Sequence, residues 1–213
     1  ENADLESALD TCIQARFQNT GQSCIAGKRL ILQENIAEEF TKKYVDKVKE
    51  LKSGDPMHED TFIGTMARVD LAEDLEKQIR DSVDAGAKIL IGGVRDGAYM
   101  QPTVLDGVTK EMAIFKEETF GPAIGITRFK TAEEAIELVN SSDFGLGVSI
   151  FTEDLEFAKN IIPEFEDGAV FVNELVKSDP RLPFGGTKIS GYGRELSLDG
   201  IQEFVNKKTV YIK

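Results

Sequence analysis

The stretch GVSIFTEDLEFAKNIIPEFEDGAVFVN, residues 147–173, decides the fold class. It opens with the apolar run VSIF and closes with a second one, AVFV, and the amphipathic segment DLEFAKNIIPEF lies between them. Short, continuous apolar runs of this kind are typical of strands that are covered on both faces. Two such strands joined by a helix form a βαβ unit, in which the strands run parallel.

The rest of the chain continues this alternation. The patterns predict strands at RLILQ (29–33), AKILIGG (87–93) and AIGITRF (123–129), extended segments at 98–108 broken at Pro102, and a last apolar run at 209–213. They predict helices at 5–17, 37–51, 67–85 and 131–142, the last with a capping box of Thr131 and Glu134. We therefore expect one α/β domain, with an open, mostly parallel sheet between helices on both faces.

The composition excludes several kinds of partner. The 213 residues carry 38 acidic and 25 basic side chains, a net charge of −13. Such a surface repels phosphate backbones and anionic membranes, so we expect no nucleic-acid partner and no membrane partner. A helix that spans a bilayer needs about 20 consecutive apolar residues. No stretch of this sequence comes close to that length. The acidic start, ENADLESALD, lacks the features of a signal peptide.

The cysteines and the histidine limit the chemistry further. Two cysteines do not make a disulfide framework, so a reduced, cytoplasmic protein is expected, although a Cys12–Cys24 bridge stays open. The only histidine, His58, lies in the loop GDPMHED, and no zinc spacing exists, so we predict no metal site. No phosphate-binding glycine motif follows a strand, and PFGGTKISGYGRE (183–195) has the composition of a shaped loop.

Cys24 is the residue on which the function depends. It stands between the end of a helix and a strand, in a connection of small and polar residues, where functional side chains often occur. A reactive cysteine needs a positive environment or a neighbouring base, and Lys28 and Arg29 are near in sequence. The pattern by itself favours an inert cysteine over a nucleophile.

Three motifs in order change this balance: FQNTGQSC (17–24), EETFGP (117–122) and PFGGTKISGYGRE (183–195). Together they resemble the catalytic half of the aldehyde dehydrogenase superfamily, and in detail the chain is similar to bacterial succinate-semialdehyde dehydrogenases. The resemblance implies that Cys24 is the nucleophile. It implies that Glu118 holds the nicotinamide ribose hydroxyls of NAD or NADP and that Phe120 packs beside that ribose.

The resemblance also implies a substrate side of the site. Phe184 matches an aromatic wall of the substrate tunnel, and Ser178 matches a serine that binds the substrate carboxylate. Arg181 lies in the same loop and is a candidate for a second contact with that carboxylate. Many succinate-semialdehyde dehydrogenases have an arginine six residues before the nucleophile, and here that position is Gln18. The nearest arginine is Arg16, which is the next candidate for the carboxylate.

The resemblance further implies that a half of the enzyme is absent from this sequence. Family members carry the cofactor-binding fold, a general-base glutamate in an ELGGK-like motif and an oxyanion asparagine before the nucleophile, and none of these motifs precedes Cys24. We expect residues 1–213 to be a catalytic domain fragment. Its last strand, about 208–213, is expected to reach out to a partner in a homo-oligomer. The choice between NAD and NADP stays open.

Two other functions remain as alternatives at this point. A cysteine hydrolase or acyltransferase needs a base beside Cys24, and His58 is the only histidine that can supply it. A non-catalytic α/β binding domain needs only that Cys24 be inert.

Overall fold

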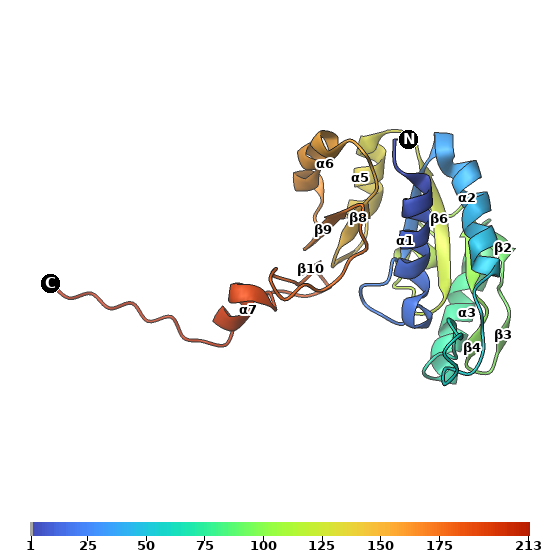
Figure 1. The fold of residues 1–213 in the computed structure, drawn as a ribbon, viewed down its shortest axis with the longest axis horizontal. Coiled ribbons are helices and arrows are strands. Elements are labelled where there is room, and N and C mark those ends of the chain that lie inside the picture. Colours follow the sequence, from blue (N-terminus) through green and yellow to red (C-terminus); the bar gives the residue numbers. More distant parts are fainter. Residues whose placement is uncertain (1) are drawn as a thin grey trace.

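A computed structural model describes residues 2–213 and contains a central sheet of four strands in the order β1-β6-β5-β2 (Figure 1). The central strand β6 pairs in parallel with β1 and with β5, while β2 pairs antiparallel with β5. These four strands are β1 (Arg29–Gln33), β2 (Lys88–Ile91), β5 (Thr103–Asp106) and β6 (Ala123–Phe129). The predicted open and mostly parallel sheet is confirmed.

Helices cover both faces of this sheet. One face carries α1 (Leu5–Phe17) and α2 (Glu34–Lys49), and the other carries α3 (Val69–Asp84) and the short α4 (Ala113–Lys116). The first interface buries Leu9, Phe17, Leu30, Phe40, Tyr44 and Ile126, and the second buries Leu75, Ile79, Met100, Leu105, Ile114 and Ala123. Because strand side chains alternate between the faces, one strand supplies both cores, and the three-layer prediction is confirmed.

The predicted helix ends are mostly accurate. Helix α5 (Ala132–Asn140) starts where predicted, and the Glu134 N–H donates to Thr131 Oγ1 at 3.3 Å. The Glu134 carboxylate accepts from the Lys130 N–H at 2.8 Å, one residue before the partner that a capping box uses. Helix α2 ends at Lys49 rather than at residue 51.

The stretch 147–173 forms the predicted strand–helix–strand unit. Strands β8 (Val148–Ile150) and β9 (Val170–Val172) pair in parallel, with α6 (Leu155–Ile161) between them. The helix is shorter than predicted and passes into a 3₁₀ turn at Ile162–Glu164, because Pro163 has no N–H to donate. In the described chain this pair is not joined to the central sheet, and its residues are half-buried rather than covered on both faces.

A cavity of about 1040 Å³ separates the two sheets. All five residues of β1 and all three of β8 line it, together with side chains from α1, α5 and α6. Figure 1 shows α5, α6, β8 and β9 on one side of α1, and β6 with α2 on the other. The small ribbons β3–β4 (Arg95–Asp96, Tyr99–Met100) and β7–β10 (Phe144–Gly145, Thr187–Lys188) lie outside both sheets.

The C-terminal segment contains the predicted last strand, about 208–213, which is expected to pair with a partner subunit. After α7 (Ser197–Gln202) the chain runs away from the body, and residues 208–213 form no strand (Figure 1). A strand needs a ladder partner, and within residues 2–213 this segment has none. Its apolar side chains Val210, Tyr211 and Ile212 are 72–88% exposed. Within residues 2–213 no helix is long and apolar enough to cross a membrane.

Candidate active site

The loop that carries Cys24 is held in an unusual backbone conformation. After α1, Asn19 and Thr20 both adopt left-handed φ values, 52° and 56°, which is rare for a β-branched residue. Contacts with a distant segment stabilise this turn: the Gly64 N–H donates to Thr20 Oγ1 at 3.1 Å, and the Ala67 N–H donates to Gln22 Oε1 at 2.8 Å. The loop then presents Cys24, whose side chain is exposed.

Arg16 lies beneath this loop and is completely buried. Its Nη1 donates to the Gly27 carbonyl at 2.9 Å, and its Nη2 donates to the carbonyls of Gly21 (2.9 Å), Thr119 (3.2 Å) and Gly121. Burial lowers the pKa of Arg16 to about 10. The guanidinium thus joins the cysteine loop to the loop of the second motif, which lies about a hundred residues later in sequence.

Two glycines make this approach possible. A Cβ atom at Gly21 would lie 2.3 Å from the Gly121 carbonyl oxygen and 2.5 Å from Arg16 Nη2. Both glycines have positive φ, 70° at Gly21 and 151° at Gly121, in the region that glycine tolerates best. Any side chain at Gly21 would therefore push the two loops apart.

Lys28 lies between the two loops and contacts both. Its Nζ donates to the Ser23 carbonyl at 2.8 Å, lies 3.6 Å from Glu118 Oε1 and stands 4.4 Å from the centroid of the Phe120 ring. Its side chain is 11% exposed, whereas that of Glu118 is 39% exposed. Burial lowers the pKa of Lys28 to about 8, and the charge of Arg16 adds to this, while Glu118 and Cys24 oppose it.

Three of these residues, Cys24, Lys28 and Glu118, line the cavity between β1 and β8. Phe120 is 39% exposed and reaches the group through its contact with Lys28. A thiol, an ammonium group and a carboxylate therefore share one cavity with apolar walls. This arrangement can hold a small polar ligand beside a thiol.

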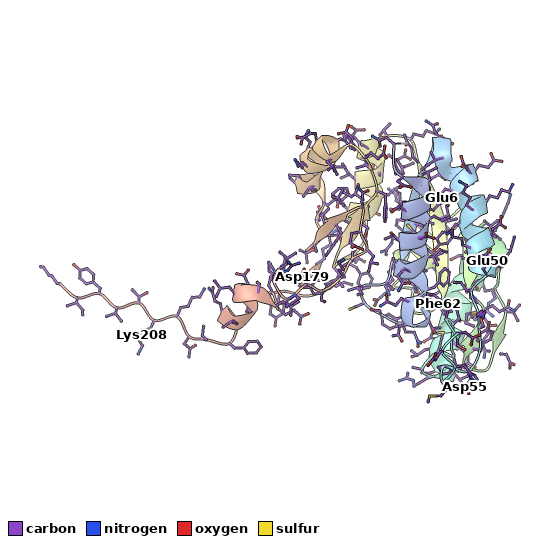
Figure 2. All side chains as sticks on the ribbon, viewed as in Figure 1. Glu6, Glu50, Asp55, Phe62, Asp179 and Lys208 are labelled. Atoms are coloured by element: carbon purple, nitrogen blue, oxygen red, sulfur yellow. The ribbon has the colours of Figure 1, made fainter. Side chains whose placement is uncertain are left out.

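The residues expected on the substrate side form a second group, outside the lining of this cavity. Ser178 and Arg181 are exposed, and the Arg181 guanidinium is bound to Asp179 through Nε–Oδ1 at 2.9 Å and Nη2–Oδ2 at 2.5 Å. Phe184 is buried and exchanges two 2.8 Å backbone hydrogen bonds with Glu195. Figure 2 shows Asp179, and hence this loop, on the side of α1 that faces α7.

Two nearby polar residues also lie outside the lining of this cavity. Gln18 is exposed, and its Oε1 accepts from Gln14 Nε2 at 2.8 Å, so it does not line the cavity. The expectation that Arg16 is a candidate for the substrate carboxylate is wrong for this structure. All its described contacts are backbone carbonyls, and no part of it reaches the surface.

The alternative base, His58, lies in an exposed turn, where the backbone N–H of His58 donates to the Asp55 carbonyl at 3.0 Å. It does not line the cavity, and Figure 2 shows Asp55 at the far end of the molecule, below β4. Within residues 2–213, no three His, Cys, Asp or Glu side chains are grouped to bind a metal.

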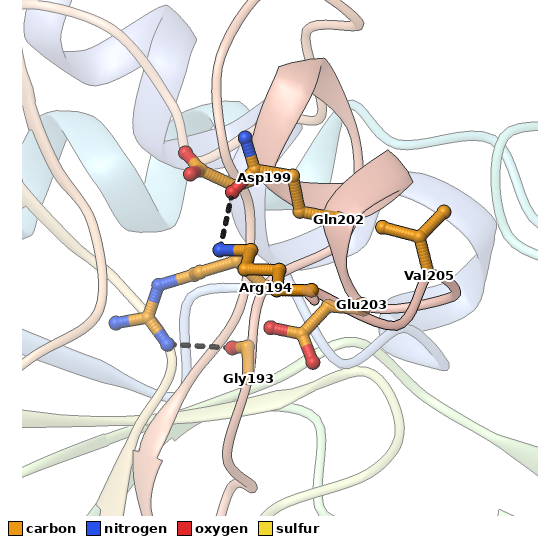
Figure 3. A pocket seen from close by; sticks show the side chains of 7 residues that line it. Gly193, Arg194, Asp199, Gln202, Glu203 and Val205 are labelled. Carbon is orange, nitrogen blue, oxygen red and sulfur yellow. Dashed lines mark hydrogen bonds between the residues drawn. The ribbon is translucent and has the colours of Figure 1, made fainter. Parts of the chain in front are cut away.

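The glycine-rich motif forms a closely packed loop next to α7 (Figure 3). The Arg194 guanidinium donates to the carbonyls of Gly186 (3.0 Å) and Gly193 (2.7 Å). A Cβ at Gly185 would lie 2.6 Å from the Gly193 carbonyl oxygen. A hollow of about 450 Å³ lies beside it, with Asp199, Gln202, Glu203 and Lys207 among its lining residues. None of its lining residues belongs to the Cys24 cavity.

Sequence reasoning missed the roles of Arg16 and Lys28. Arg16 had a detectable signal, because it follows Cys12 by four residues and Ile13 by three, on the apolar stripe of α1. A charged residue in that stripe must be buried with hydrogen-bond partners. Lys28 had only its proximity to Cys24, and nothing in the sequence shows where its side chain points.

Comparison with known proteins agrees with this fold and with the motifs. The profile described as the aldehyde dehydrogenase family matches residues 1–210. An Escherichia coli protein named as an NAD(P)+ succinate semialdehyde dehydrogenase is 47% identical over 99% of this chain and 46% of its own length. A Synechocystis protein named as a probable NADP(+) succinate-semialdehyde dehydrogenase is 46% identical over 100% of this chain and 47% of its own length.

The crystal structure of an NAD-dependent aldehyde dehydrogenase from Sinorhizobium meliloti superposes with a TM-score of 0.92 at 39% identity, over 95% of this chain and 41% of that one. The chain belongs to the aldehyde dehydrogenase family. It spans about half the length of the curated relatives it matches.

The burial of Arg16 leads to a prediction about stability. In Arg16→Met, four buried or half-buried carbonyls lose a donor. The Gly121 carbonyl keeps the Ala123 N–H at 2.8 Å, and each of the others left unsatisfied costs about 1–3 kcal/mol. Removing the buried charge offsets part of this, so we expect the free energy of unfolding to fall by about 2–4 kcal/mol. Urea denaturation measures it. Arg181→Met, at an 85% exposed side chain, is the control and should change stability by less than about 0.5 kcal/mol.

The two cysteines are expected to differ in reactivity. Cys24 is exposed, whereas Cys12 packs against the core beside α2, where burial raises the pKa of its thiol to about 12. Because the thiolate is the reactive form, brief iodoacetamide treatment at about pH 7.5 should label Cys24 at least about tenfold faster. Mass spectrometry of the two peptides measures both rates. Equal rates would contradict the assignment of Cys24 as the accessible thiol.

Proposed function

We propose that this chain supplies the catalytic part of an NAD(P)-dependent aldehyde dehydrogenase, which oxidises succinate semialdehyde to succinate. The observation that carries the proposal is the cavity that Cys24 and Glu118 share, with Lys28 between them, in a chain of this family. The names of the Escherichia coli and Synechocystis relatives support the choice of substrate. The identity of these relatives to this chain, 46–47%, supports the same chemistry at Cys24.

The residues of the second motif fit the cofactor that this reaction needs. The Glu118 carboxylate is 39% exposed at the cavity and can accept two hydrogen bonds from ribose hydroxyls. The exposed face of the Phe120 ring can pack beside the same ribose. When bound, the nicotinamide supplies the hydride acceptor. The names of the relatives include NAD and NADP, and both remain open for this chain.

Cys24 would then act as a covalent nucleophile. Its thiolate adds to the aldehyde carbon and forms a thiohemiacetal, whose oxyanion needs nearby donors. Among the described residues the Cys24 backbone N–H has no acceptor, so it is available for this oxyanion. Loss of a hydride leaves a thioester on Sγ, and a water molecule cleaves it to release the carboxylate and the thiol.

We propose further that residues 1–213 are a catalytic domain of a longer enzyme, because the chain spans about half of its relatives. The general base that activates the water would come from the other half. The exposed apolar segment 208–213 would add to a neighbouring subunit of a homo-oligomer. Two free thiols are consistent with a reducing compartment such as the cytoplasm.

For the substrate, we propose that the loop from Ser178 to Phe184 reads the end that carries the carboxylate. The Ser178 hydroxyl would donate to the carboxylate, Arg181 would add a contact after leaving Asp179, and Phe184 would support the wall of the tunnel. Gln18, at the end of α1, would contribute a polar side chain at its mouth. None of these four residues lines the Cys24 cavity, so the support for this proposal is the motif resemblance and the names of the relatives.

Activity tests the role of Cys24. In the full-length enzyme, Cys24→Ala should lower kcat for succinate semialdehyde by at least about a thousandfold, because the covalent step is lost. Cys12→Ala, at the other cysteine, is the matched control and should keep kcat within about twofold. Absorbance of the reduced nicotinamide measures the rate. The 213-residue chain by itself should show no useful turnover, and substantial turnover from it would refute the division into two halves.

Substrate selectivity tests Ser178. A hydrogen bond to a charged group contributes about 1.5–3 kcal/mol, so in the full-length enzyme Ser178→Ala should raise KM for succinate semialdehyde about tenfold or more. KM for butanal, which has a similar length and no carboxylate, should stay nearly unchanged. If both substrates suffer equally, Ser178 shapes the loop and does not read the carboxylate.

A further inference from the structure

We propose that Lys28 is a positioning residue that joins the two halves of the site: its ammonium group holds Glu118 and Phe120 against the loop that carries Cys24. This inference rests on the proposed function for its consequence in catalysis. The positioning role itself is argued only from the contacts that Lys28 makes.

The contacts of Lys28 are divided between the two loops. On the cysteine side, its Nζ donates at 2.8 Å to the Ser23 carbonyl, which also accepts from the Ala26 N–H at 3.2 Å and so closes the turn around Cys24. On the other side, the same Nζ lies 3.6 Å from Glu118 Oε1 and 4.4 Å from the centroid of the Phe120 ring. One charge therefore makes a hydrogen bond, an ion pair and a cation–π contact.

Because Lys28 is largely buried, these contacts are the main source of solvation for its ammonium group. With 11% of its side chain exposed, water contributes little to its solvation, and the Ser23 carbonyl and Glu118 must replace it. The Glu118 side chain is 39% exposed and contacts Lys28 through Oε1, which leaves the carboxylate accessible to a ligand. Lys28 thus fixes the direction of Glu118 without enclosing it.

The charges that face Lys28 are few. Arg16 lies beneath the same loops and repels it, while Glu118 and a thiolate at Cys24 attract it. A positive charge beside a cysteine stabilises the thiolate over the thiol. The Lys28 ammonium group is therefore expected to attract a negatively charged sulfur at Cys24, and this attraction should fade as pH rises through the pKa of Lys28, about 8.

The first experiment measures Cys24 alkylation by iodoacetamide against pH in this chain, with mass spectrometry of the Cys24 peptide. In Lys28→Met the rate at about pH 7, where the wild-type lysine is charged, should fall about threefold or more, and the two rates should converge near about pH 9.5, where that lysine is neutral. Lys28→Arg keeps the charge and should stay within about twofold of the wild type. Lys77→Met removes an exposed lysine that pairs with Asp81 and should leave the profile unchanged.

The second experiment measures KM for the cofactor in the full-length enzyme. Lys28→Met should raise this KM about fivefold, as expected for loss of a partly buried ion pair. Glu118→Gln should raise it as well, and the double variant should be no worse than Glu118→Gln, because Lys28 acts through Glu118. Additive effects would overturn this route from Lys28 to the cofactor.

The two proposals fail in different ways. Alkylation needs no turnover, so a shifted profile supports the role of Lys28 even in an enzyme that oxidises no aldehyde, and only the proposed function then fails. If the enzyme oxidises succinate semialdehyde but the Lys28→Met and wild-type profiles coincide and KM for the cofactor is unchanged, the role of Lys28 is refuted. Circular dichroism of each variant verifies folding, and Lys28→Gln replaces Lys28→Met if the latter unfolds.

Discussion

The site depends on a buried positive charge that has no carboxylate partner among the residues the structure describes. Arg16 is completely buried, and its hydrogen bonds go to carbonyl oxygens of two loops. Desolvating a guanidinium is costly, and it is tolerated only when fixed acceptors replace water. Those acceptors therefore stay where Arg16 needs them, and the left-handed φ values of Asn19 and Thr20 and the missing side chain at Gly21 follow from the same constraint.

Above this fixed base, positive groups outnumber negative ones. Three cations, Arg16, Lys28 and Arg29, interact with the Glu118 carboxylate near the exposed Cys24, and Asp167 offsets part of the charge of Arg29. The chain as a whole carries a charge of −13, so this positive region is local and does not reflect the general surface. Positive charge is therefore concentrated at the loop that carries Cys24.

The layered fold explains why these groups converge. Lys28 is the residue before β1, and Glu118 and Phe120 precede the adjacent strand β6, so parallel pairing brings the segments before both strands to the same end of the sheet. Helix α1 places Arg16 and the turn after it at that end as well. The loop from Ser178 to Phe184 belongs to the C-terminal part of the chain and is not held by Arg16 or Lys28.

Much of the architecture was determined by the sequence alone. Periodic apolar runs and caps predict α1, β1, α5 and the β8–α6–β9 unit, because local burial patterns dictate these elements. The motifs predict Cys24 and Glu118 as site residues. Long-range partners are what local patterns leave open: residues 208–213 form no strand within residues 2–213, because a strand requires a neighbour that no local pattern specifies. Only the tertiary structure shows that Arg16 is an internal anchor and that Lys28 contacts both the Cys24 loop and Glu118, because these contacts depend on loops about a hundred residues apart meeting in space.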